Sequence, residues 1–156
     1  MTPTEPLALH HSWPLTDSRQ QFRDGALLPP RAAGLMLSRE KGDMLVDHGV
    51  GVWTCTIPDD AMNWNDAMYD ILGFPQGAAV TRAEALAVYA EESRAATERL
   101  RAHAIRHRRG FTIDVEMHPA AALPRWMRLV ASPVIVDGRV ERLEGLKLPI
   151  DPPTRR

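Results

Sequence analysis

Residues 111–148 read FTIDVEMHPAAALPRWMRLVASPVIVDGRVERLEGLKL, and this stretch decides the fold. Its first part alternates apolar and polar residues, the period-two pattern of a half-buried strand, with the apolar set Phe111, Ile113, Val115 and Met117. A second strand-like run covers 125–136. Asp137-Gly138 follows, a pair that favours a tight hairpin because both central residues of that turn need positive φ. A third strand over 140–148 then returns beside the second.

Two further strands are predicted upstream. Residues 50–57 (VGVWTCTI) are rich in strand-forming types and end at the turn cluster Pro58-Asp-Asp, and 62–64 form a short partner strand. With the three strands above, these make one antiparallel sheet of five strands.

Helices are predicted between the two groups of strands. Asn65 or Asp66 caps a short helix that runs through Leu72 and stops at Gly73. Thr81-Arg-Ala-Glu84 has the form of a capping box that opens a second helix. The longest helical pattern runs from about 92 to 109, with Gly110 as its stop. Strands, then helices, then strands favour an α+β fold with the helices packed on one face of the sheet.

The first 48 residues differ in composition and form an expected N-terminal extension. Five prolines interrupt it, and Asp17-Ser-Arg-Gln20 resembles a capping box for a short helix that stops at Gly25. A second helix after Pro30 is expected to dock on the domain formed by residues 49–150. We expect the first dozen residues and the tail 151–156 to be disordered.

Bulk composition excludes several classes of protein. The formal net charge of the 156 residues is −1, so no overall field attracts nucleic acid or an anionic membrane. The single cysteine, Cys55, excludes a disulfide within the chain and a cysteine metal cluster. No apolar run approaches the roughly 20 residues that span a bilayer, and no signal peptide is evident. We expect a cytoplasmic protein without membrane insertion.

Several short motifs occur in a consistent order. They are Gly51-Val-Trp53, Trp64-Asn-Asp66, Tyr69-Asp-Ile-Leu-Gly-Phe74, Val115-Glu116, Arg125-Trp126, Asp137-Gly-Arg-Val140 and Leu143-Glu-Gly145. Over residues 49–150 this series resembles the PAS domain family, in the subclass whose first strand reads glycine, aliphatic, tryptophan. The ending departs from that family: Leu148-Pro-Ile-Asp-Pro-Pro153 replaces the usual link to an output helix, and two adjacent prolines cannot continue a helix.

The resemblance implies a sensory or regulatory protein that acts through protein contacts in signal transduction. If the chain is the whole protein, it has no output module of its own, so we expect contact with a signalling protein such as a sensor histidine kinase. Homodimer formation is also expected. The implied interface is the outer face of the sheet together with the N-terminal helix. We expect this face to carry Trp53 or its strand neighbours, and Arg128 and Val130.

The resemblance also implies an internal cavity beneath the helices. Its expected lining or adjoining core residues are Trp64, Tyr69, Leu72, Leu100 and Ala104. A haem- or small-metabolite-binding sensor is therefore the alternative function. On a wheel of about 100° per residue, His103 and His107 share a face with Leu100, so either residue is a candidate haem ligand. Cys55 lacks the motif around a flavin-reactive cysteine, so no flavin photoadduct is expected.

Catalytic groups are sparse in this sequence. Asp114 and Glu116 lie two apart on one strand, opposite the apolar set, and are expected to face water, whereas a catalytic acid pair needs a buried member. No serine–histidine–acid arrangement or glycine-rich phosphate loop is present. The arginines near the end of the long helix are interpreted as a solvated face rather than a nucleic-acid site. We expect a non-enzymatic protein; a small α+β-barrel enzyme is the third hypothesis.

Overall fold

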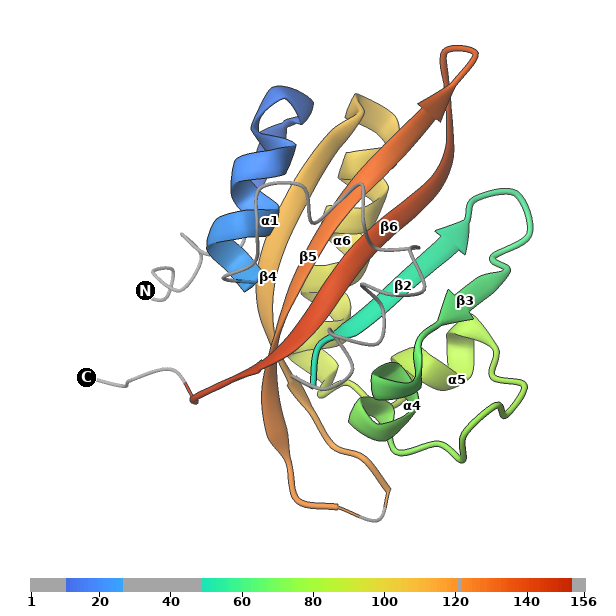
Figure 1. Ribbon diagram of the computed structural model, residues 1–156, viewed down its shortest axis with the longest axis vertical. Coiled ribbons are helices and arrows are strands. Elements are labelled where there is room, and N and C mark those ends of the chain that lie inside the picture. The colour runs from blue at the N-terminus through green and yellow to red at the C-terminus, as the bar shows by residue number, and fades with distance from the viewer. Residues whose placement is uncertain (1–10, 27–48, 121, 153–156) are drawn as a thin grey trace.

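The computed structural model describes residues 11–26, 49–120 and 122–152. Its centre is a six-stranded antiparallel sheet in the order β1-β4-β5-β6-β2-β3 (Figure 1). The strands are β1 (His11–Pro14), β2 (Gly51–Thr56), β3 (Met62–Trp64), β4 (Arg109–Met117), β5 (Arg125–Val136) and β6 (Arg139–Ile150). The prediction of five strands is therefore wrong by one, because the N-terminal extension supplies β1.

Strand β1 joins the sheet through a close tryptophan–glycine pairing. Trp13 lies opposite Gly110 of β4, is almost fully buried, and donates from its indole nitrogen to Thr112 Oγ1 over 3.1 Å. A Cβ on Gly110 would lie 2.1 Å from the Trp13 ring, so only glycine leaves room for it. The prediction of Gly110 as a helix stop is wrong. The left-handed residue there is Arg108, with φ of 56°.

Three of the helices connect the strands as predicted. They are α4 (Asp66–Leu72), α5 (Arg82–Leu86) and α6 (Glu91–His107). The Asn65 side chain caps α4 and also accepts from the backbone of Val52, which ties the helix to β2. Gly73 ends α4 in the left-handed conformation, and Thr81 with Glu84 forms the predicted capping box of α5. The hairpin between β5 and β6 has positive φ at Asp137 and Gly138, as predicted.

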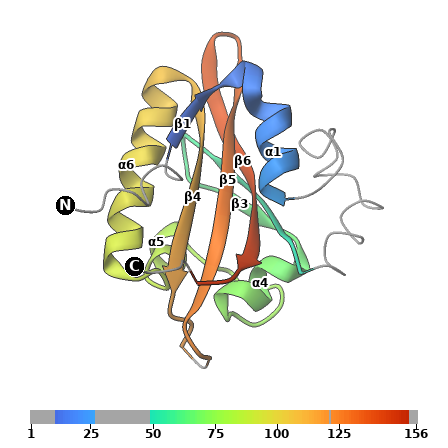
Figure 2. The same ribbon diagram turned by 90° about the vertical axis from the view of Figure 1, so that its left-hand side faces the viewer.

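Helices cover both faces of the sheet. Helix α6 lies on the inner face with α4 and α5, while α1 (Ser18–Ala26) lies across the opposite, outer face (Figures 1 and 2). The expectation of helices on one face holds for α4–α6, but α1 makes a second layer. No helix among the described residues is long and apolar enough to cross a membrane.

Each face has its own core. The inner core joins the helices to residues such as Ile113, Val115, Met117 and Met127, all fully buried. The outer core packs Trp13 and Phe22 of the N-terminal extension on Val50, Val52, Val130 and Leu146. Residues 11–26 of the extension are thus part of the folded unit. The expected helix after Pro30, residues 1–10 and the end of the tail lie outside the described residues.

A candidate ligand-binding cavity

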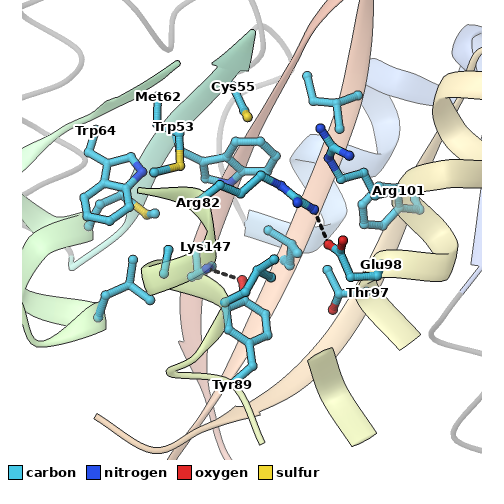
Figure 3. Close-up of a pocket in the computed structure, with 17 residues that line it drawn as sticks. Trp53, Cys55, Met62, Trp64, Arg82, Tyr89, Thr97, Glu98, Arg101 and Lys147 are labelled. Atoms are coloured by element: carbon cyan, nitrogen blue, oxygen red, sulfur yellow. Dashed lines mark hydrogen bonds and ion pairs between the residues drawn. The ribbon is translucent and has the colours of Figure 1, made fainter. Parts of the chain in front are cut away.

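A cavity of about 90 Å³ lies between the inner face of the sheet and helices α4, α5 and α6 (Figure 3). Most of its wall is apolar, from two tryptophans, two methionines, several leucines and a phenylalanine. Lining residues that carry polar groups or sulfur include Trp53, Cys55, Arg82, Tyr89, Thr97, Glu98, Arg101 and Lys147.

Trp53 is positioned by a glycine on the neighbouring strand. It faces Gly145 in the β2–β6 register, and a Cβ on Gly145 would lie 2.5 Å from the Trp53 ring and 2.1 Å from the Val130 carbonyl oxygen. The bare backbone at Gly145 therefore lets the indole lie against β6. This close approach gives a physical reason for the glycine in the Leu143-Glu-Gly145 motif.

Lys147 is the buried cation of the cavity, with only 4% of its surface exposed. Its ammonium group donates a hydrogen bond to Tyr89 Oη and lies 4.6 Å from the centre of the Tyr89 ring, a cation–π contact. Among the described residues, no carboxylate forms an ion pair with it. A buried ammonium without an acidic partner is costly, so this arrangement is unusual.

The other charged residues of the wall form ion pairs, either within the wall or with a residue outside it. Arg82 of α5 forms an ion pair with Glu98 of α6, and Arg101 of α6 forms one with Asp60 over 3.0 Å. Both arginines are partly exposed, so these pairs lie towards solvent. Of the three cationic residues described in the wall, Lys147 is the most buried.

Two further polar groups that line the cavity lack hydrogen-bond partners among the described residues. They are the indole N–H of Trp53 and the hydroxyl of Thr97, and both atoms are buried. Buried polar groups are almost always hydrogen-bonded, so an unpartnered pair in one cavity is a mark of a ligand or water site.

Cys55 also lines this cavity. Burial raises the pKa of its thiol, an effect that the nearby Arg101 opposes only in part. The thiolate is the reactive form of cysteine, so burial makes this thiol a poor nucleophile.

The predicted cavity residues divide into two groups. Trp64 and Leu72 line the cavity. Leu100 and Ala104 pack in the inner core beside it, and Tyr69 stacks edge-on against Trp64 with ring centres 5.0 Å apart. The last three residues support the wall and do not line the cavity.

His103 and His107 are exposed, and neither lines the cavity. The prediction that they share the apolar face of α6 is wrong. The buried residues of this helix are Thr97 and Ala104, which lie at about +60° and +40° from Leu100 on the wheel, whereas His103 lies at about −60°. The buried face of α6 is therefore centred on the side of Leu100 that is further from His103.

The predicted interface residues occupy different faces. Trp53 lies on the inner face and not on the outer face, where it was expected. Val130 is on the outer face but fully buried in the core beneath α1. Arg128, also on the outer face, forms a two-pronged ion pair with Asp114, with nitrogen–oxygen distances of 2.8 and 3.1 Å. Asp114 is buried, so the expectation that it faces water is wrong.

Haem and flavin do not fit the cavity as it stands. None of the described histidines lines it, and a volume of about 90 Å³ is too small for the ring system of either cofactor. The site therefore suits a molecule of a few heavy atoms.

Sequence reasoning missed Lys147, Tyr89, Thr97, Arg82 and Glu98. One signal was available for Lys147: counting by twos, it shares a strand face with Leu143 and Gly145, so a lysine stands where an inward apolar residue is expected. The Arg82–Glu98 pair joins two helices, and no local sequence pattern predicts it.

No family model and no curated protein matches this chain. Solved structures match it in fold. An RNA-binding light-oxygen-voltage (LOV) receptor is 19% identical with a TM-score of 0.59, over 69% of this chain and 31% of the receptor chain. The N-terminal domain of a diguanylate cyclase with a PAS/PAC sensor from Marinobacter aquaeolei is also 19% identical with a TM-score of 0.59, over 64% of this chain and 94% of that one.

A sensory box histidine kinase/response regulator from Burkholderia thailandensis gives the same TM-score of 0.59 at 14% identity, over 72% of this chain and 85% of that one. The chain spans about a third of the LOV receptor and nearly all of the cyclase's domain. At these identities the likeness concerns the fold. The chain has the α+β fold of PAS and LOV sensor domains, as found in histidine kinases and diguanylate cyclases, with a six-stranded sheet.

Proposed function

We propose that this chain is a sensory domain whose signal is a small molecule bound in the cavity between the sheet and helices α4–α6. The observation that carries the proposal is the set of buried polar groups around one cavity. They are the Lys147–Tyr89 pair, the indole N–H of Trp53 and the hydroxyl of Thr97. An apolar wall with a few polar groups in it is the usual character of a small-molecule site.

Binding without turnover is the second part of the proposal. The cavity's nucleophile candidate, Cys55, has a raised thiol pKa, and none of the described histidines lies in the wall to act as a base towards it. Glu98, the one acid that the described part of the wall contains, forms an ion pair with Arg82. A site with neither an activated nucleophile nor a free acid–base pair favours recognition over catalysis.

The proposed output of the sensor is contact with a signalling protein. We propose a histidine kinase of a two-component system as this partner, and a homodimer as the active form of the chain. The support for this is the fold shared with a sensory box histidine kinase. Because α1 covers Val130 and much of the outer face, such contacts would involve α1 itself or the sheet edges.

The binding proposal can be tested by two-dimensional amide NMR on the full chain. The probes are a panel of small alcohols, amides and carboxylates of up to about six heavy atoms. At least one probe is expected to give saturable shifts at the cavity residues Leu129 and Leu143. Replacing Ala85 by Phe fills the cavity from α5 and should abolish the shifts.

Ala83→Phe is the matched control, because Ala83 is an exposed residue of the same helix and the change has the same helix propensity. It should bind as the wild type does. Saturable shifts in no member of the panel, or shifts that survive Ala85→Phe, would overturn the proposed function.

A further inference from the structure

We propose that the cavity recognises a small organic carboxylate, whose charged group is held by Lys147 and Tyr89 while its short carbon chain occupies the apolar part of the cavity. This inference rests on the proposed function, that the cavity is a ligand site. It adds the chemical class of the ligand.

Lys147 has hydrogen-bonding capacity that its described partner does not use. An ammonium group has three donors, and among the described residues Tyr89 Oη takes one of them. Lys147 is 4% exposed, so water cannot freely take the others. An anion in the cavity would supply the negative charge that a buried ammonium needs.

Among the residues that line the cavity, the buried polar groups are mainly hydrogen-bond donors. The indole N–H of Trp53 only donates. The Tyr89 hydroxyl accepts from Lys147, so its own hydrogen is left to donate, and the Thr97 hydroxyl can do either. An ionised carboxylate only accepts, through two oxygens. An amide or an alcohol also brings donors, which this set of groups cannot satisfy as well.

The wall of the cavity carries more positive than negative charge. Among the described residues, three cationic side chains (Arg82, Arg101 and Lys147) and one acidic side chain (Glu98) line it. Glu98 is paired with Arg82, and Asp60 is paired with Arg101, so neither carboxylate neutralises Lys147. The excess of positive charge favours an anion over a neutral or cationic molecule.

The size and polarity of the cavity also favour a small anion with a single charge. The remaining wall includes Met68, Leu72, Phe111, Leu129 and Leu143, which offer no hydrogen-bond donor to a multiply charged anion such as phosphate. A volume of about 90 Å³ suits a body of a few carbon atoms. Propionate and isobutyrate meet both conditions.

The test is a calorimetric and NMR titration of the full chain with isobutyrate and with isobutyramide, its uncharged analogue of nearly the same shape, at pH 7 and constant ionic strength. Isobutyrate is expected to bind about tenfold or more tightly than the amide, since hydrogen bonds to charged groups are the stronger ones. Lys147→Met should weaken isobutyrate binding by about tenfold or more and remove the preference. Tyr89→Phe should weaken it by a smaller factor.

Two comparisons keep the outcome interpretable. Lys147→Met replaces a buried charge with an apolar side chain of similar length, so its melting temperature should equal or exceed that of the wild type. Arg139→Met removes an exposed charge on the same strand and should leave binding unchanged. Equal affinity for acid and amide, or isobutyrate binding that survives Lys147→Met, would overturn the carboxylate inference and leave the cavity as a ligand site. Failure of both probes and of the whole panel would overturn the proposed function as well.

Discussion

Asp114 and Arg128 form an ion pair on the outer face of the sheet. The Asp114 side chain is 5% exposed and takes both prongs of the Arg128 guanidinium, whereas the Arg128 side chain is 28% exposed. The hydrogen bonds that Arg128 donates to Asp114 raise the pKa of Arg128, so the guanidinium stays charged throughout the accessible pH range. Loss of Arg128 would leave a buried carboxylate unpaired.

Arg128→Ala is therefore expected to lower the free energy of unfolding by about 3 kcal/mol, the cost of breaking a buried pair. Urea denaturation at pH 7 measures it. Arg139→Ala, on an exposed residue of β6, should change stability by less than about 0.5 kcal/mol. The double variant Asp114→Asn, Arg128→Ala should be more stable than Arg128→Ala alone. A double variant that is less stable than either single variant would contradict this account.

Glu144 makes the stability of the folded protein depend on pH. Burial raises its pKa above the ordinary value of 4.5, and Arg142, 3.7 Å away, offsets this only in part. The folded protein therefore holds this proton more tightly than the unfolded chain does. Its contribution to stability is fully present below pH 4.5 and is lost as pH rises through the folded-state pKa.

Glu144→Gln should accordingly be more stable than the wild type at pH 7, and the difference should shrink as the pH falls to 4. Denaturant midpoints across this range measure the difference. Glu141→Gln, at an exposed position three residues before it along β6, is the control and should show no such trend. A Glu144→Gln effect that is constant with pH would rule out this interpretation of the burial.

Single residues were the hardest scale to predict from the sequence. Period two places residues on one of two faces, but in β4 both faces are buried, so Asp114 was assigned to solvent. The pattern does not report that α1 covers the outer face. The buried stripe of α6 is rotated from the predicted stripe by about half its width, and this rotation leaves His103 outside it.

At the scale of elements, β1 and α1 show that the N-terminal extension belongs to the sheet. Phe22 of α1 and Trp13 of β1 contact edge-on with ring centres 6.5 Å apart, and both are buried on the outer face. Ser18 adds a hydrogen bond to Ser132 of β5 over 3.1 Å. These contacts fix the helix against the middle strands of the sheet.

Phe22→Ala should therefore lower the free energy of unfolding by about 3–5 kcal/mol, as expected for a buried aromatic side chain. Chemical denaturation gives the total, and amide exchange should show lost protection across α1 and β1. Arg19→Ala, an exposed residue of the same helix, should have little effect. Full stability in Phe22→Ala would mean that α1 is not docked in solution.

The elements were predicted well where local chemistry specifies them. The Asp137-Gly138 turn, the Thr81–Glu84 capping box, and the β3 and β5 limits follow from short-range rules and match the structure. Strand β1 was missed because HSWP is four residues long, contains proline, and forms a strand only through its pairing with β4. A contact between distant segments leaves no local signature.

At the scale of the whole molecule, the ion pairs join the helices around the cavity to each other and to the sheet. Arg82–Glu98 connects α5 to α6, and Arg101–Asp60 connects α6 to the turn between β2 and β3. A ligand that contacts Lys147 on β6 and Tyr89 between α5 and α6 would link the same parts from inside. A ligand bound in the cavity would thus act on both the helices and the sheet. The other face of that sheet is covered by α1.

The most direct test of a ligand-binding cavity is to locate a bound probe by nuclear Overhauser contacts. We predict contacts from the methyl protons of isobutyrate to the side chains of Leu129 and Leu143 in the wild type, and their loss in Ala85→Phe. Contacts confined to exposed residues such as Leu123 or Val136 would contradict the account, as would the complete absence of contacts at saturating isobutyrate.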